Sequence, residues 1–261
     1  MTERGFALLA VLWVITALTA LTGAGMIVAR LGNDTTRNRI LLARAEWARE
    51  ACGEILQARF AHDPAIRQLE PIDLGRGTWC QASIVDPAAQ LNLNTADSIA
   101  LARLFAFAGA GRQVIARAIA LRRGGTIYDV RAITGVDSEL AVALAPLVTT
   151  RGTGVVNVNA APLAVLGTLP GLTEEAVQLL VARRGARPLH NADELAGALS
   201  RSSRDIFLRS YAEFVRSTVF DAPQLVATIA GGVRGTPIVA RATLTLVPVP
   251  GRLAVIHRET E

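Results

Sequence analysis

Residues 5–30 read GFALLAVLWVITALTALTGAGMIVAR, and this stretch decides how the chain is organised. From Phe6 to Ala29 there are 24 residues without Asp, Glu, Lys or Arg. An α-helix rises about 1.5 Å per residue, so roughly 20 apolar residues cross the hydrocarbon core of a bilayer. The sequence therefore predicts a transmembrane helix over residues 6–29 and a chain tethered to a membrane.

Three interpretations of this segment compete. A cleaved secretory signal would have an apolar region of about 7 to 15 residues before a small-x-small site. This run is longer, and residues 24–26 form a poor site, so an uncleaved signal anchor fits better. The junction of Gly5 and Phe6, between a polar leader at residues 1–5 and the apolar helix, resembles the class III signal of type IV pilin-like proteins. That resemblance implies cleavage after Gly5 by a prepilin peptidase and methylation of Phe6.

The chain departs from the pilin pattern at Ala10. Pilins usually carry Glu at the fifth position of the mature chain, which is Ala10 when counted from Phe6. A carboxylate in lipid is costly and is kept where a partner neutralises it, in pilins the N-terminal amine of a neighbouring subunit. Ala10 cannot form this pair. In lacking the Glu, the chain resembles the minor pseudopilin family of general secretion pathway protein K.

The composition indicates a folded chain with dispersed charge. Its 261 residues suffice for an anchor and one or two small domains. All 27 basic residues are Arg, the net charge is +5, and the Arg residues are scattered, which is more typical of a solvated surface than of a nucleic-acid patch. Three of them, Arg30, Arg37 and Arg39, follow the apolar span, so the positive-inside rule does not support an N-inside topology.

The helix is expected to continue past the membrane. Apolar residues recur at spacings of four and three between Leu41 and Ile55, which predicts one helix from Phe6 to about Phe60, ended by Pro64. Segments with alternating or β-branched residues predict strands at 78–85, 214–219, 225–230, 238–247 and 252–257. The expected breaks between the last four are Gly231-Gly232, Gly235 with Pro237, and residues 248–251.

The middle of the chain contains a diverged repeat. The segment NLNTA at residues 92–96 recurs as NVNAA at 157–161, and each copy leads into a helical pattern and then an Arg pair. Asn94 or Thr95 is expected to cap the helix after the first copy, and Pro162 to lie in the first turn of the helix after the second.

Two loops of the repeat resemble helix-hairpin-helix turns, centred on Gly135 and Gly171. In DNA-binding hairpins a Gly-rich loop directs backbone N–H groups at a phosphate. Here Asp137 and Thr173 replace the second Gly, and carboxylates follow where a phosphate would lie. The loops are therefore predicted to serve packing or protein contact, and nucleic acid is not an expected partner.

The resemblance to the type II secretion protein K family covers nearly the whole chain. The motif at residues 157–161, with Leu169-Pro170-Gly171 behind it, is similar to the second SAM-like domain of that family, and residues 129–148 to the end of the first. The resemblance implies an α+β fold. In it a long transmembrane and amphipathic helix packs on an antiparallel, pilin-like sheet, and two SAM-like, helix-hairpin-helix-like repeats form an inserted all-α region.

The expected organisation is a leader at 1–5, a transmembrane helix at 6–29, the pilin-like helix and first strands at 30–90, SAM-like domains at about 91–150 and 151–205, and C-terminal strands at 206–261. The resemblance implies a minor pseudopilin at the tip of a type II secretion pseudopilus, single-pass in the inner membrane with its head in the periplasm. Implied partners are other minor pseudopilins, the major pseudopilin, prepilin peptidase, the membrane, and a secreted substrate or the outer-membrane secretin. The alternative is a membrane-anchored, DNA-binding hairpin protein of competence type.

No cofactor, metal site or catalytic site is expected. Some members of the family bind calcium, which needs six to eight oxygen ligands, but residues 115–127 are Arg-rich here and no acidic cluster occurs. The three His residues lie in different segments and no hydrolase or dinucleotide motif is present, so an enzyme is not predicted.

Cys52 and Cys80 are the cysteines of the chain. Two interpretations remain open. They are either buried unpaired thiols, or a bridge between the long helix and the first strand, formed in an oxidising compartment.

Overall fold

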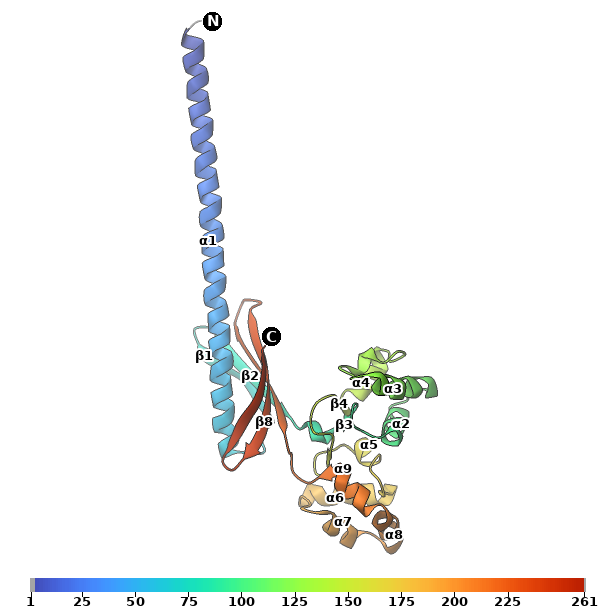
Figure 1. Ribbon diagram of the computed structural model, residues 1–261. Coiled ribbons are helices and arrows are strands. Elements are labelled where there is room, and N and C mark those ends of the chain that lie inside the picture. The colour runs from blue at the N-terminus through green and yellow to red at the C-terminus, as the bar shows by residue number, and fades with distance from the viewer. Residues whose placement is uncertain (1–2, 261) are drawn as a thin grey trace.

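The computed structural model describes residues 3–260, and for residues 3–10 it describes the helical backbone alone. A single helix, α1 (Glu3–His62), runs from the N-terminal end, and its C-terminal part packs on one face of a sheet (Figure 1). The predicted continuous helix from Phe6 to about Phe60 is confirmed. It ends shortly before Pro64, which disfavours helix in the residue that precedes it.

The sheet has five antiparallel strands in the order β1-β2-β7-β8-β9. Their bounds are β1 Gln68–Gly75, β2 Thr78–Val85, β7 Leu225–Val233, β8 Val239–Val249 and β9 Arg252–Thr260. Strand β2 has the predicted bounds. Strand β1 was not predicted because Pro71 interrupts its pattern. Pro is tolerated on an edge strand such as β1, where the pairing with β2 shifts register between Leu69 and Ile72.

Two predictions about the C-terminal strands are wrong. The expected break at Gly231-Gly232 lies inside β7, because both residues pair with β2. The expected strand at residues 214–219 is instead helix α9 (Tyr211–Ser217) followed by the short strand β6 (Thr218–Val219). The aromatic residues of α9, Tyr211 and Phe214, lie three residues apart and so share one helix face. Phe214 is fully buried against Phe207, seven residues earlier, with ring centroids 4.9 Å apart.

The helical region lies between β2 and β7 and consists of two similar halves. Its elements are η1 Pro87–Ala89, β3 Leu91–Asn92, α2 Ser98–Phe107, α3 Arg112–Gly124, η2 Val130–Ala132, α4 Ser138–Leu144, β4 Val148–Thr149, β5 Val156–Asn157, α5 Leu163–Leu166, α6 Glu174–Ala186, α7 Ala192–Ala198, α8 Arg201–Arg209, α9 and β6. In each half the Asn motif forms a two-residue parallel bridge, β3 with β4 and β5 with β6. The expected domain boundary after residue 205 falls inside α8.

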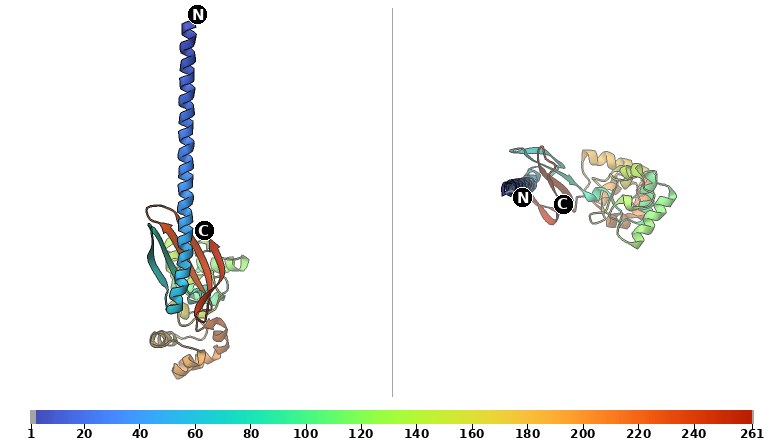
Figure 2. Two further views of the ribbon diagram at one scale, coloured as in Figure 1. Left: turned by 90° about the vertical axis from the view of Figure 1, so that its left-hand side faces the viewer. Right: turned by 90° about the horizontal axis from the view of Figure 1, so that it is seen from above.

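The helical region is an insertion into a hairpin position of the sheet. Val85, the last residue of β2, lies opposite Val226 of β7. The chain therefore leaves and re-enters the sheet on neighbouring strands, at the end opposite the β7–β8 hairpin. Figures 1 and 2 show the helical region set beyond this end of the sheet and to one side of α1. Each part has its own hydrophobic core.

Small residues bring α1 close to the sheet. Ala45 and Ala48 of α1 are fully buried, and they face Gly231 of β7. A Cβ atom on Gly231 would lie 2.6 Å from the Ala45 carbonyl oxygen and 2.8 Å from the Ala48 carbonyl carbon. The backbones of helix and strand therefore touch directly, and no larger residue fits between them.

Replacing Gly231 with Ala is expected to lower the free energy of unfolding by about 1 to 3 kcal/mol, the usual cost of overpacking a core. The added methyl group meets backbone atoms, which cannot rotate away. Denaturant unfolding of the detergent-solubilised chain measures the change. Gly185→Ala in α6 is the matched control, because nothing lies within 4 Å of its Cβ position. Equal stability of the two variants would contradict the packing described above.

Candidate functional site

The described N-terminal part of α1, residues 11–40, is exposed throughout. From Val11 onward α1 contains a window long and apolar enough to cross a bilayer, and none of that window is buried. Side chains from residue 11 to Ile40 are exposed along the whole circumference of the helix. The junction Gly5–Phe6 and the position Ala10 lie on the helical backbone, but their side chains are outside the described residues.

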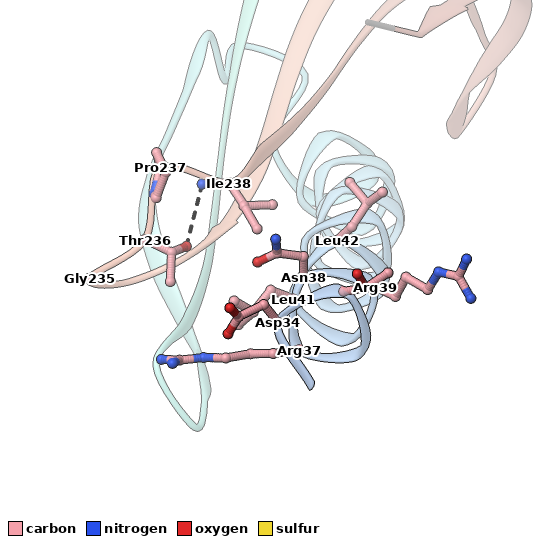
Figure 3. A pocket seen from close by; sticks show the side chains of 11 residues that line it. Asp34, Arg37, Asn38, Arg39, Leu41, Leu42, Gly235, Thr236, Pro237 and Ile238 are labelled. Carbon is pink, nitrogen blue, oxygen red and sulfur yellow. Dashed lines mark hydrogen bonds between the residues drawn. The ribbon is translucent and has the colours of Figure 1, made fainter. Parts of the chain in front are cut away.

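A groove separates α1 from the β7–β8 hairpin where the helix leaves the sheet (Figure 3). It has a volume of about 880 Å³ and is lined by α1 residues between Asp34 and Leu42 and by residues 235–238 of the hairpin. Arg37, Asn38 and Asp34 point toward the hairpin, whereas the guanidinium of Arg39 points away from it (Figure 3). The lining combines charged side chains with apolar ones and holds no Cys, His or Ser.

The repeated Asn motif is structural. The Asn94 amide donates to the Ile127 carbonyl at 2.9 Å and accepts from the Ile127 N–H at 2.8 Å. Asn159 makes the same pair of hydrogen bonds with Leu189, at 2.8 and 3.0 Å. Each Asn thus joins two segments of its half of the helical region, because it forms hydrogen bonds with both backbone groups of a buried residue about thirty positions away.

The capping predictions for these motifs are wrong. Asp97, not Asn94 or Thr95, caps α2 by accepting from the N–H groups of Ile99 and Ala100. Asn94 is unavailable because both ends of its amide are bound to Ile127. Pro162 is the residue that precedes α5 and does not lie in its first turn.

The two hairpin loops pack against neighbouring segments on one side, and Gly135 remains exposed while Gly171 is half-buried. Gly135 and Gly171 have φ angles of 97° and 75°, a conformation that favours Gly. A Cβ atom on Gly171 would lie 2.9 Å from the Ser210 Cβ, and one on Gly135 would lie 3.1 Å from the Val114 Cγ2. The sequence identified these loops correctly as turns, and the structure places the Cβ side of each Gly against a neighbouring segment.

Carboxylates occupy the helix ends that follow the loops. Glu175, in the first turn of α6, accepts from the hydroxyls of Ser203 at 2.6 Å and Ser200 at 3.0 Å, and these bonds lower the pKa of its carboxyl group. Asp137 accepts from the Leu140 N–H and caps α4. A nucleic-acid phosphate would meet these negative charges, so the geometry does not favour the DNA-binding alternative.

The two cysteines lie together in the interface between helix and sheet. Cys52 of α1 and Cys80 of β2 are both fully buried and are held as thiols in this structure. Burial raises the pKa of the Cys52 thiol well above its usual range, and a hydrogen bond with the Cys80 thiol raises it further. Burial also raises the pKa of Cys80. The thiols therefore stay protonated and unreactive while the head is folded.

A polar joint connects the sheet to the second half of the helical region. The Asn157 amide donates to the Asp86 carboxylate at 2.7 Å, and the other Asp86 oxygen accepts from the Ala88 N–H. Burial raises the pKa of Asp86 in spite of these hydrogen bonds. No pattern in the sequence indicates the contact of Asp86 with Asn157. Within residues 3–260, no group of three Asp, Glu, His or Cys side chains is placed to hold a metal ion.

No known family profile and no curated protein sequence matches this chain. Among solved structures, the fold is similar to a chain of the crystal structure of the GspK-GspI-GspJ complex from the enterotoxigenic Escherichia coli type 2 secretion system. The TM-score is 0.65 at 15% sequence identity, over 87% of this chain and 99% of that chain. The predicted α+β fold is confirmed, and the resemblance to secretion protein K is confirmed at the level of the fold.

The bridge between Cys52 and Cys80 stays a prediction for protein folded in an oxidising compartment and isolated without reductant, where the bond would form before folding buries the two thiols. The bridge would enclose 27 intervening residues, and in the chain-entropy model a loop of this size contributes roughly 3 to 4 kcal/mol to stability. Thiol labelling of the denatured, unreduced protein measures the bridge. The reduced protein is the control and should show two reactive thiols after unfolding. Two free thiols in the unreduced sample would contradict the bridge.

Proposed function

We propose that this chain is a minor pseudopilin of a type II secretion system, in the position that protein K occupies. The observation that carries the proposal is the shared architecture over nearly all of the matched chain, from the sheet with its helix to the inserted helical region. An exposed apolar anchor and hairpin loops followed by acidic first turns fit a structural subunit of a membrane-based fibre better than an enzyme or a DNA-binding protein.

The proposed location is the inner membrane, with α1 spanning the bilayer and the head in the periplasm. The exposed apolar part of α1 supports the anchor. The orientation follows from the proposed family, since Arg30, Arg37 and Arg39 on the head side do not indicate it.

Two features support a position at the tip of the pseudopilus. Ala10 replaces the Glu that would pair with a neighbour's N-terminal amine, and a subunit at the tip has no neighbour above it to engage. The helical region adds bulk beyond the end of α1, with α6, α7 and α8 farthest from the anchor (Figure 1). That bulk would obstruct a further subunit stacking above.

The exposed part of α1 supplies a surface for other pseudopilins. Ile40 and Trp47 are 51% and 58% exposed, lie seven residues apart and therefore share one helix face. Proposed partners are the other minor pseudopilins and the major pseudopilin, with prepilin peptidase acting during maturation. A secreted substrate or the outer-membrane secretin would meet the helical region at the distal end.

The mature protein is expected to begin at Phe6. The Gly5–Phe6 bond lies at the mouth of the apolar helix, where a membrane peptidase reaches it without unfolding the span. Intact-mass analysis of membrane-extracted protein should show loss of residues 1–5 and addition of one methyl group. Cells without prepilin peptidase are the control and should retain the leader. A leader that is retained in cells with an active peptidase would contradict the cleavage and favour the uncleaved signal anchor.

The tip position is tested by two separate changes followed by crosslinking of assembled pseudopili. Replacing residues 87–224 with Asn-Gly, which suits a two-residue hairpin between Asp86 and Leu225, should preserve the sheet and remove the obstruction. Ala10→Glu introduces a carboxylate that costs about 2.5 to 3.5 kcal/mol in the membrane unless it is paired. Both variants should crosslink along the shaft more often than the unchanged protein.

The unchanged protein is the reference and should crosslink mainly at the tip. Equal crosslinking of the unchanged protein along the shaft and at the tip would disprove the assignment. So would a deletion variant that folds and keeps both its position and fibre initiation.

A further inference from the structure

The end of the head that faces the apolar part of α1 carries four arginines, which we call the basic collar: Arg30 and Arg37 on α1, Arg76 at the β1–β2 turn and Arg234 at the β7–β8 turn. All four residues are exposed. The two turns lie side by side, because the Arg234 N–H donates to the Gly77 carbonyl at 2.8 Å. Figure 1 shows both turns at the end of the sheet that faces the N-terminal part of α1.

The collar lies close to the expected membrane surface. Arg30 follows directly on Ala29, the last residue of the apolar run. Arg37 lies about 12 Å beyond Ala29 along the helix axis. The headgroup layer extends roughly 5 to 8 Å beyond the hydrocarbon on each side of a bilayer. Side chains on a helix tilt toward its N-terminus, which here is toward the membrane. Arg30 therefore lies among the headgroups, and the guanidinium of Arg37 reaches their edge.

The four arginines share one side of the anchor. Arg37 precedes Leu41 by four residues, and Leu41 belongs to the stripe of α1 that continues through Ala45 and Ala48 against the sheet. Arg30 precedes Arg37 by seven residues and so falls on the same face. Transmembrane helices are tilted by about 20° on average. A tilt of α1 toward its sheet side brings both turns, with Arg76 and Arg234, down to the headgroups.

Two carboxylates lie among these arginines and do not cancel their charge. Asp34 lines the groove beside Arg37. Asp73 forms an ion pair with Arg234, with 3.3 Å between the Asp73 Oδ2 and the Arg234 Nη2, and the Arg234 side chain stays 61% exposed. Four guanidinium groups against two carboxylates leave this side of the head positive.

We propose that the basic collar binds the phosphate groups of anionic phospholipids and holds α1 tilted, with the head resting on the bilayer. Guanidinium groups bind phosphate oxygens in bidentate fashion. The groove between α1 and the β7–β8 hairpin, with Arg37 at its edge, gives a headgroup room beside the helix (Figure 3). The proposal rests on the membrane anchor of the proposed function and is independent of any role in secretion.

The test uses the full chain in nanodiscs of phosphatidylcholine, with or without phosphatidylglycerol. A fluorophore on Thr236→Cys, at the β7–β8 turn, reports its distance from the bilayer through quenching by headgroup-spin-labelled lipid. Cys52 and Cys80 stay unlabelled because both are buried with raised thiol pKa values. Quenching should be stronger with phosphatidylglycerol. It should fade when the salt concentration rises from about 0.1 M to about 1 M, where the Debye length falls from roughly 10 Å to 3 Å.

Arg37→Gln and Arg76→Gln should each lower the ratio of docked to undocked heads in phosphatidylglycerol discs about fivefold. Arg59→Gln is the matched control. It makes the same charge change at an exposed site of the same helix, about 45 Å beyond Ala29, and should leave quenching unchanged.

Equal quenching in the two kinds of disc would overturn the proposal. An effect of Arg59→Gln as large as that of Arg37→Gln would do the same, because it would reflect net charge alone. Inorganic phosphate that releases the head at matched ionic strength would indicate a site for free anions in place of lipid. A chain that does not enter the discs at all would overturn the anchor, a result distinct from equal quenching by an inserted chain.

Discussion

The head depends on the direct contact between α1 and β7 at Gly231. The backbone of α1 approaches the strand so closely at Ala45 and Ala48 that no side chain fits on Gly231. This approach sets the distance between helix and sheet. It also brings Cys52 next to Cys80 and fixes the direction in which the β7–β8 hairpin projects along the helix. The sheet is thereby held at a defined orientation to the anchor.

The helical region is inserted without interrupting the pairing of the sheet. It enters after Val85 and leaves before Val226, which are paired neighbours, and it has a core of its own. Its two halves use the same device, an Asn whose amide binds a distant backbone in both directions. Placing this region at the end of the sheet opposite the β7–β8 hairpin adds surface there without altering the contact of α1 with the sheet (Figure 1).

The charged side chains fall into two sets, one that forms internal hydrogen bonds and one that is exposed to solvent. Carboxylates such as Glu175 and Asp86 are bound by Ser hydroxyls or an Asn amide and hold neighbouring elements together. Arginines at the end of the head that faces the N-terminal part of α1, such as Arg76 and Arg234, are exposed and are available to a partner outside the protein. The hairpin loops at Gly135 and Gly171 each pack one side against a neighbouring segment. Asp137 caps the helix after the first loop, and Thr173 caps the helix after the second.

The sequence by itself determined α1, strand β2, the repeat and the α+β class, because helical periodicity, strand alternation and repeated motifs are local properties. It did not reveal β1, where Pro71 hides an edge strand, or α9, where β-branched residues obscured the helical spacing of Tyr211 and Phe214. Only the tertiary structure decided that Gly231 lies inside a strand and which backbone Asn94 binds. Both depend on residues far away in the chain, and local pattern carries no information about which distant groups meet.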